Sequence, residues 1–153
     1  MKILEQQYQH ITSSREVLLN YCKTLSQKAL LEKLEGFGNA NIHYLLLHIA
    51  NCYKFWIASQ ALQRETSFLE YEKTYSFSEI RDAFKEVDAF MSVFLNTRFP
   101  TEIQYEFRTG VKGTASPLKL FTHVTTHEFH HKGQILSMSR HMGYTPVDTD
   151  VMR

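Results

Sequence analysis

Four stretches of the chain repeat apolar residues at the spacing of an α-helix, and no other feature limits the fold as strongly. The first stretch runs from about Ile3 to Leu25 without proline or glycine, and the second from Ile42 to about Leu62. The third covers residues 76–96 and the fourth residues 116–142. Apolar residues three or four positions apart lie on one face of a helix. The sequence therefore predicts an all-α fold, a four-helix bundle in which each helix buries one face.

Capping residues mark where these helices begin and end. Asn41 is a suitable N-cap for the second helix, and Ser76 with Glu79 matches the capping-box pattern S-x-x-E for the third. Ser116–Pro117 places a capping serine before a proline in the first turn of the fourth helix. That helix is expected to end at Gly143, a residue type that favours helix C-termini.

The connection between the third and fourth helices does not follow the helical pattern. Ile103, Tyr105 and Phe107 alternate with polar residues, and Thr109–Gly110 follows. Alternation followed by a turn is typical of a short strand or hairpin. We expect an irregular or hairpin excursion over residues 101–116. A connection of this length also permits a crossover.

Length and composition favour a single soluble globular domain. The 153 residues fit a single domain, 1–153. A net charge of +1 gives no field for binding nucleic acid or an anionic membrane. No apolar run approaches the roughly 20 residues of a membrane span. The polar start lacks a signal peptide, so we expect a cytoplasmic protein in which Cys22 and Cys52 are reduced.

The stretch "HEFHH", His127 to His131, contains the pattern H-E-x-x-H. At roughly 100° per residue, His131 lies near the middle of the apolar face of the fourth helix, with His127 and Glu128 on either side. His123 and His130 fall toward the edge, as does His141. Burying such groups unpaired would cost several kcal/mol. A hydrogen-bonded polar cluster could satisfy them, but two imidazoles at i and i+4 reach one metal ion, which satisfies them better.

A third ligand is required, and His48 is the best candidate. It lies at the border of the apolar stripe on the second helix. Cys52, one turn later, is expected to be a small core residue that could also line the site. His10 and His43 have no comparable support and are expected at the surface.

Two well-known metal sites do not fit the sequence. The extended zinc-protease motif requires glycine and histidine where this chain has Gln134 and Ser137. No glutamate follows Glu128, and Asp148 and Asp150 lie in a short tail. A ferritin-like di-metal bundle requires two E-x-x-H motifs on different helices. Only one such motif exists here.

The histidine motifs resemble those of the DinB/YfiT-like family of metalloenzymes, and the resemblance covers almost the whole chain. In "THEFHHKGQI", His127, His131 and Gln134 match the last-helix motif H-x-x-x-H followed by glutamine. In "LLLHIANCYKFW", His48 occupies the position of the family's helix-two histidine. The resemblance implies a metal site made of His48, His127 and His131.

The resemblance also implies a function. Family members are commonly dimers that bind a divalent metal such as zinc or nickel, and characterised relatives are transferases or isomerases that use low-molecular-weight thiols. The resemblance therefore implies a homodimeric, metal-dependent enzyme acting on a small molecule, such as a thiol S-transferase or a related transferase or isomerase. Glu128 would orient a ligand histidine or move a proton. Its alternative role, pairing with Lys132, is disfavoured by its core-side position. The competing function is a non-catalytic, metal-stabilised bundle that acts as a binding or stress-related protein.

Overall fold

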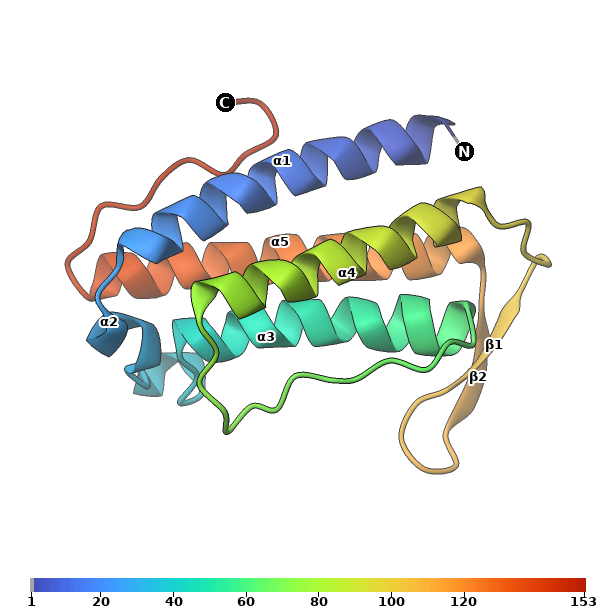
Figure 1. The fold of residues 1–153 in the computed structure, drawn as a ribbon, viewed down its shortest axis with the longest axis horizontal. Coiled ribbons are helices and arrows are strands. Elements are labelled where there is room, and N and C mark those ends of the chain that lie inside the picture. Colours follow the sequence, from blue (N-terminus) through green and yellow to red (C-terminus); the bar gives the residue numbers. More distant parts are fainter. Residues whose placement is uncertain (1) are drawn as a thin grey trace.

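The computed structural model describes residues 2–153, and within that range four long helical segments lie side by side (Figure 1). They are α1 (Lys2–Thr24), α3 (Ile42–Tyr53) with its π-helical continuation η2 (Lys54–Ala61), α4 (Phe77–Asn96) and α5 (Pro117–His141). The smaller elements are α2 (Gln27–Leu31), the 3-10 helix η1 (Glu35–Phe37), β1 (Ile103–Glu106) and β2 (Lys112–Ala115). The predicted helical bundle is confirmed, with helix boundaries close to those expected.

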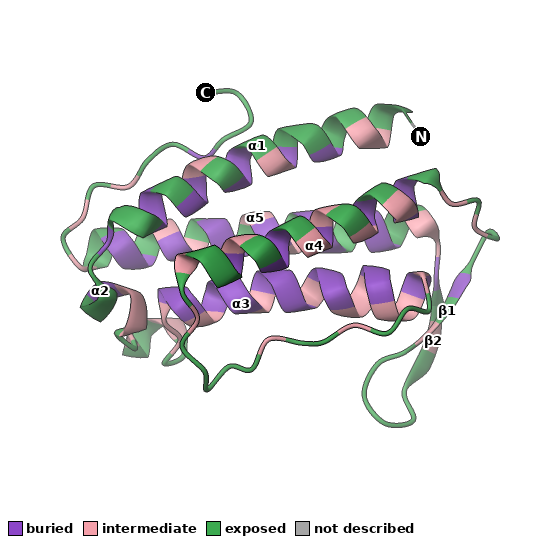
Figure 2. Ribbon diagram, in the orientation of Figure 1, coloured by how far each residue is buried: buried purple, intermediate pink, exposed green. Residues whose placement is uncertain are grey.

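The apolar stripes of the long helices meet in one core. Leu19 of α1, Leu46 of α3, Val87 of α4 and Val124 of α5 are each fully buried. Figure 2 shows buried residues along the facing sides of these helices and exposed residues on their outer sides. Burying one such side chain stabilises the fold by roughly 1.5–3 kcal/mol. In residues 2–153, no helix combines the length and apolar character required to cross a bilayer.

The predicted helix caps are present. The side-chain oxygens of Asn41, Ser76 and Ser116 each accept a hydrogen bond from a backbone N–H in the first turn of α3, α4 and α5. Glu79 completes the capping box by accepting a hydrogen bond from the backbone N–H of Ser76. The chain leaves α5 at Gly143, whose φ of 89° lies in the left-handed region that glycine adopts without strain.

The predicted hairpin precedes α5. β1 and β2 are antiparallel, with Ile103 opposite Ala115 and Glu106 opposite Lys112. Ile103 and Ala115 are buried against the bundle, whereas the loop residue Phe107 is 38% exposed. The hairpin therefore packs at one end of the bundle and leaves its loop beyond the core (Figure 1).

The crossover of the bundle lies elsewhere than the sequence suggested. The connection that carries the hairpin joins α4 to α5, which run in opposite directions (Figure 1). It is α3 and α4 that run in the same direction, so residues 62–76 return along the length of α3 before α4 begins (Figure 1). We call residues 62–76 the crossover segment.

Polar side chains of α3 and η2 hold the crossover segment in place. Asn51 bonds Leu69 twice, since Nδ2 donates to the carbonyl oxygen of Leu69 and Oδ1 accepts from its N–H, both at 2.9 Å. The Lys54 ammonium donates to the carbonyl oxygen of Ser67 at 2.9 Å. An extended segment has no helical hydrogen bonds of its own, so these side chains satisfy its backbone.

His43 belongs to this set, and the prediction that it lies at the surface was wrong. It is only 6% exposed, and its Nε2 accepts a hydrogen bond from the backbone N–H of Tyr75 at 3.0 Å. Its place next to the helix N-cap concealed this role, because periodicity does not show that another segment covers that face. Burial lowers the pKa of His43.

Candidate metal centre

Three histidines from two helices converge at one point. His127 Nε2 lies 3.1 Å from His48 Nε2 and 3.1 Å from His131 Nε2. One ligand atom from each of the three can be chosen so that all lie within 4.8 Å of one another. The i, i+4 spacing places His127 and His131 on the same side of α5, and α3 supplies His48 opposite them. We call His48, His127 and His131 the three-histidine cluster.

Hydrogen bonds alone cannot satisfy the cluster well. An imidazole nitrogen carries either one proton or one lone pair, in a single direction in the plane of the ring. His127 Nε2 has two nitrogen neighbours at 3.1 Å. It cannot form a well-directed hydrogen bond with both of them. A cation at the point of convergence would accept all three lone pairs, so the cluster could hold a metal ion.

Neighbouring side chains contact the ring nitrogens of His131 and His48 that face away from that point. Gln134 Oε1 lies 2.6 Å from His131 Nδ1 and, being a carbonyl oxygen, accepts a hydrogen bond from it. Tyr71 Oη lies 3.2 Å from His48 Nδ1. A proton on Nδ1 leaves Nε2 with a free lone pair, which is the form that binds a metal. The match of Gln134 to the family motif thus has a physical reason.

The environment also keeps these rings neutral. Burial, followed by repulsion from His131 and His48, lowers the pKa of His127 to about 3. Burial also lowers the pKa values of His48 and His131. Neutral imidazole is the form of histidine that coordinates a metal, so the cluster is ready to bind at neutral pH.

Comparison with known proteins agrees with the fold. The sequence model of the DinB family matches residues 1–153. The chain belongs to the DinB family. The uncharacterized protein YizA of Bacillus subtilis (strain 168) is 26% identical over 152 residues, which cover 96% of this chain and 90% of YizA. A crystal structure of a DinB-like protein from Bacillus cereus ATCC 10987 superposes with a TM-score of 0.75 at 18% identity, covering 97% of this chain and 96% of that one. The second likeness shows a DinB-like fold.

Three further residues lie near the three-histidine cluster but do not belong to it: His123, His130 and Cys52. His130 and His123 are exposed, although the His123 ring stacks 5.7 Å from that of His127. Cys52 is half-buried, with its Sγ 3.9 Å from His123 Nε2. Burial, and then the charge of Glu128, raise the pKa of the Cys52 thiol to about 12, which keeps it protonated.

Glu128 faces away from the cluster, into the core. It is fully buried and forms two hydrogen bonds with Arg15, at 3.0 Å and 2.8 Å. Tyr53 donates to it at 2.7 Å, and the Lys132 ammonium lies 3.0 Å away. Among the hydrogen bonds formed by residues 2–153, none joins Glu128 to a histidine of the cluster. The prediction that Glu128 does not pair with Lys132 was wrong, because Lys132 is itself buried beside it.

This buried ion network joins four helices behind the cluster. Arg15 of α1 also donates to Asp88 of α4 at 2.6 Å, while Tyr53 belongs to α3 and Glu128 to α5. Burial alone would raise the pKa of Glu128, but the charges of Arg15 and Lys132 outweigh it and hold the pKa below its ordinary value. Glu128 therefore stays ionised and fixes the turn of α5 that carries His127 and His131.

A pocket of about 580 Å³ opens beside the cluster. His48 and His127 form part of its wall. Most of the remaining lining is aromatic or apolar, and it comes from α3, η2, the crossover segment, the hairpin loop and α5. The π-helical turn of η2 contributes the adjacent residues Phe55 and Trp56. Such turns are rare and often occur at functional sites. We call this hollow the aromatic pocket.

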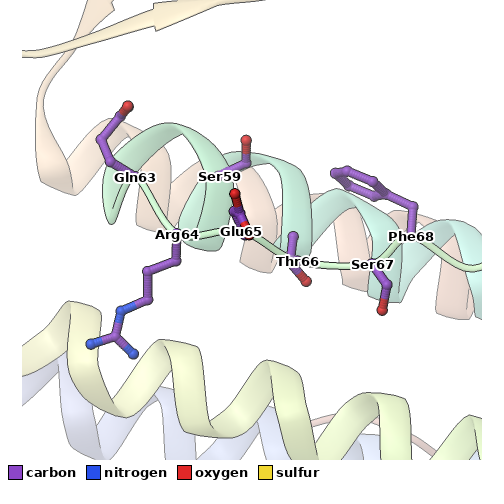
Figure 3. A pocket seen from close by; sticks show the side chains of 7 residues that line it. All are labelled: Ser59, Gln63, Arg64, Glu65, Thr66, Ser67 and Phe68. Carbon is purple, nitrogen blue, oxygen red and sulfur yellow. The ribbon is translucent and has the colours of Figure 1, made fainter.

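A second hollow, of about 700 Å³, lies along the start of the crossover segment. Figure 3 shows its lining, with Arg64 pointing toward α4 and Phe68 pointing to the opposite side. The lining offers one carboxylate, Glu65, and neither histidine nor cysteine. This hollow is larger than the aromatic pocket but lacks the groups needed to bind a metal.

Proposed function

We propose that His48, His127 and His131 hold one divalent metal ion, with zinc or nickel as the candidates. Two imidazole nitrogens at the usual distance of about 2.0–2.1 Å from one tetrahedral zinc lie roughly 3.3–3.4 Å apart. The 3.1 Å separations within the cluster are close to this value. The donor set also fits, because neutral imidazoles are common ligands of both metals.

We further propose that the protein is a metal-dependent enzyme, a transferase or isomerase of the thiol-using kind. The observation that carries this proposal is that two histidines of the cluster also line the aromatic pocket. A bound divalent ion would supply a Lewis acid that lowers the pKa of a thiol and favours its anionic form. The pocket wall would keep water from the reacting molecules, and His48 and His127 would position them.

For Glu128 we propose a role that differs from direct contact with a ligand histidine. Its oxygens accept hydrogen bonds from Arg15 and Tyr53, so its contacts support an indirect role. It would hold α5 so that His127 and His131 both face His48. Direct proton transfer by Glu128 stays a prediction.

Metal content tests the proposed centre with two adjacent histidines. His131→Ala removes one of three ligands and should lose most of the bound zinc or nickel, because two ligands hold an ion poorly. His130→Ala is the matched control on the same turn of α5 and should retain it. Elemental analysis of both variants beside the wild type measures the outcome. Loss of metal from the His130 variant alone would contradict the assignment.

We also propose that the protein is a homodimer. The support is the family resemblance together with apolar side chains left in contact with solvent at the two ends of the chain. Ile3 is 77% exposed and Met152 is 91% exposed. Light scattering at micromolar concentration should give twice the mass of the 18.0 kDa chain. A mass equal to one chain would contradict this proposal.

A further inference from the structure

The aromatic pocket has a lining that restricts what can bind beside the cluster. None of its eleven lining residues is lysine, arginine, aspartate or glutamate. A charged ligand group entering it would lose water without gaining a partner of opposite charge, and such a loss costs several kcal/mol in general. Away from the metal position itself, the lining therefore disfavours charged groups of a ligand.

The aromatic side chains of the pocket are arranged around Trp56. The rings of Trp56 and Phe107 stack with their centroids 5.7 Å apart and their planes at 18°. Phe55 meets Trp56 edge to face at 5.0 Å, and His123 meets it edge to face at 5.3 Å. Edges and faces of this kind are the surfaces that another aromatic ring packs against favourably.

The mouth of the pocket leaves apolar area unburied. Phe68 is 48% exposed, Tyr71 is 39% exposed and Phe107 is 38% exposed. They come from the crossover segment and the hairpin loop, two segments that are far apart in the sequence. A ligand that covers these side chains would remove apolar surface from water, which is favourable in proportion to the area.

From these observations we infer that the pocket binds the apolar part of the substrate, an uncharged small molecule with an aromatic group and one metal-binding heteroatom. This inference rests on the proposed metal function. The aromatic group lies against Trp56 and Phe107, and the heteroatom reaches the point where His48 and His127 converge. Glutathione and similar thiols carry several charges, so this pocket takes the apolar reactant instead of the body of such a thiol.

Thiol probes of different polarity test the inference on the protein loaded with cobalt(II). Phenylmethanethiol, 2-mercaptoethanol and glutathione each present one thiol, and binding is followed by the thiolate-to-cobalt absorption band. Phenylmethanethiol should bind at least about tenfold more tightly than 2-mercaptoethanol, which is the ratio of affinities expected from burying one aromatic ring. Glutathione should bind no more tightly than 2-mercaptoethanol.

Variants of the hairpin loop show whether the preference arises in this pocket. Phe107→Ala should remove most of the preference for phenylmethanethiol while the cobalt content stays unchanged. Val111→Ala is the control, because Val111 is on the same loop, is 55% exposed and lies outside the lining. Trp56→Ala provides a second test from η2, in case the hairpin variant changes the loop.

The outcomes separate the inference from the proposed function. Cobalt content, measured first on the same samples, tests the metal centre alone. Protein that binds no cobalt overturns both proposals. Protein that binds cobalt but holds all three thiols equally, or glutathione most tightly, overturns only the inference. A tenfold preference that Phe107→Ala abolishes and Val111→Ala keeps supports it.

Discussion

Gln134 Oε1 accepts a hydrogen bond from His131 Nδ1 at 2.6 Å, and this bond determines which nitrogen His131 offers to the cluster. Gln134→Leu removes the acceptor with little change in size. We expect zinc affinity to fall by about 10–100-fold, the usual cost of losing such an outer partner, while one ion still binds at high concentration. Competition with a chelator measures the affinity.

The control for this variant is Gln9→Leu, which replaces an exposed glutamine on α1. It should leave zinc affinity unchanged. Equal affinities of the Gln134 variant and the wild type would mean that the hydrogen bond does not orient His131.

Histidines with a lowered pKa predict how stability depends on pH in the metal-free protein. Partial or full loss of solvent contact lowers the pKa of five histidines in the folded state: His43, His48, His123, His127 and His131. In the unfolded chain they titrate near 6.5, so below that pH the unfolded state binds more protons. The free energy of unfolding should therefore fall as the pH drops from about 7 to about 5.

Urea unfolding at the two pH values, with a chelator present, measures this effect. His127→Phe removes the group with the most lowered pKa and should reduce the pH dependence. A midpoint that is constant or rises toward acid in the wild type would be inconsistent with neutral, buried histidines.

At the scale of single residues, sequence reasoning worked where spacing within one helix was sufficient. His127 and His131 follow from i, i+4 spacing on an apolar face, whereas His48 required the family resemblance. His43 and Lys132 were misjudged, since what contacts them comes from the crossover segment and from α1. A pattern within one helix does not identify the partner packed against it.

At the scale of elements, the ion network around Glu128 ties α1, α3, α4 and α5 together. Glu128→Gln leaves Lys132 buried without its negative partner and leaves Arg15 paired with Asp88 alone. Removing one member of a buried ion pair costs about 3–5 kcal/mol, so the variant should be strongly destabilised. Urea unfolding of the metal-free variant measures the change in free energy.

Glu102→Gln makes the same chemical change at an exposed position and should alter stability by less than about 0.5 kcal/mol. If Glu128→Gln unfolds like the wild type, the network contributes little to stability. A stable but inactive variant would then favour direct proton transfer by Glu128.

The elements themselves were largely predictable. Caps, proline and glycine marked the helix ends, and alternation marked the hairpin, because these features act through the local backbone. The crossover segment and the π-helical turn of η2 were not found. The first is held by Asn51 of α3 and Lys54 of η2, which lie outside the segment in the sequence. The second buries residues 54, 57, 58 and 61, which is the spacing of an ordinary helix.

At the scale of the whole molecule, the three-histidine cluster joins α3 to α5, so a bound metal should stabilise the entire fold. Free zinc at about 100 times its dissociation constant would raise the free energy of unfolding by about 2.7 kcal/mol. Thermal unfolding with and without zinc measures this. Zinc should raise the stability of the His131→Ala variant very little. A variant that zinc stabilises as much as the wild type would show that the metal binds elsewhere.

We propose that the three-histidine cluster holds one metal ion and leaves a position open toward the aromatic pocket. X-ray absorption spectroscopy at the zinc edge, in buffer without thiols, tests it most directly because it counts the ligands. We expect three imidazole nitrogens at about 2.0–2.1 Å from the zinc ion, at least one further light atom from solvent, and no sulfur. Fewer than three imidazoles, or a sulfur at about 2.3 Å supplied by Cys52, would contradict it and indicate a closed site with a structural role.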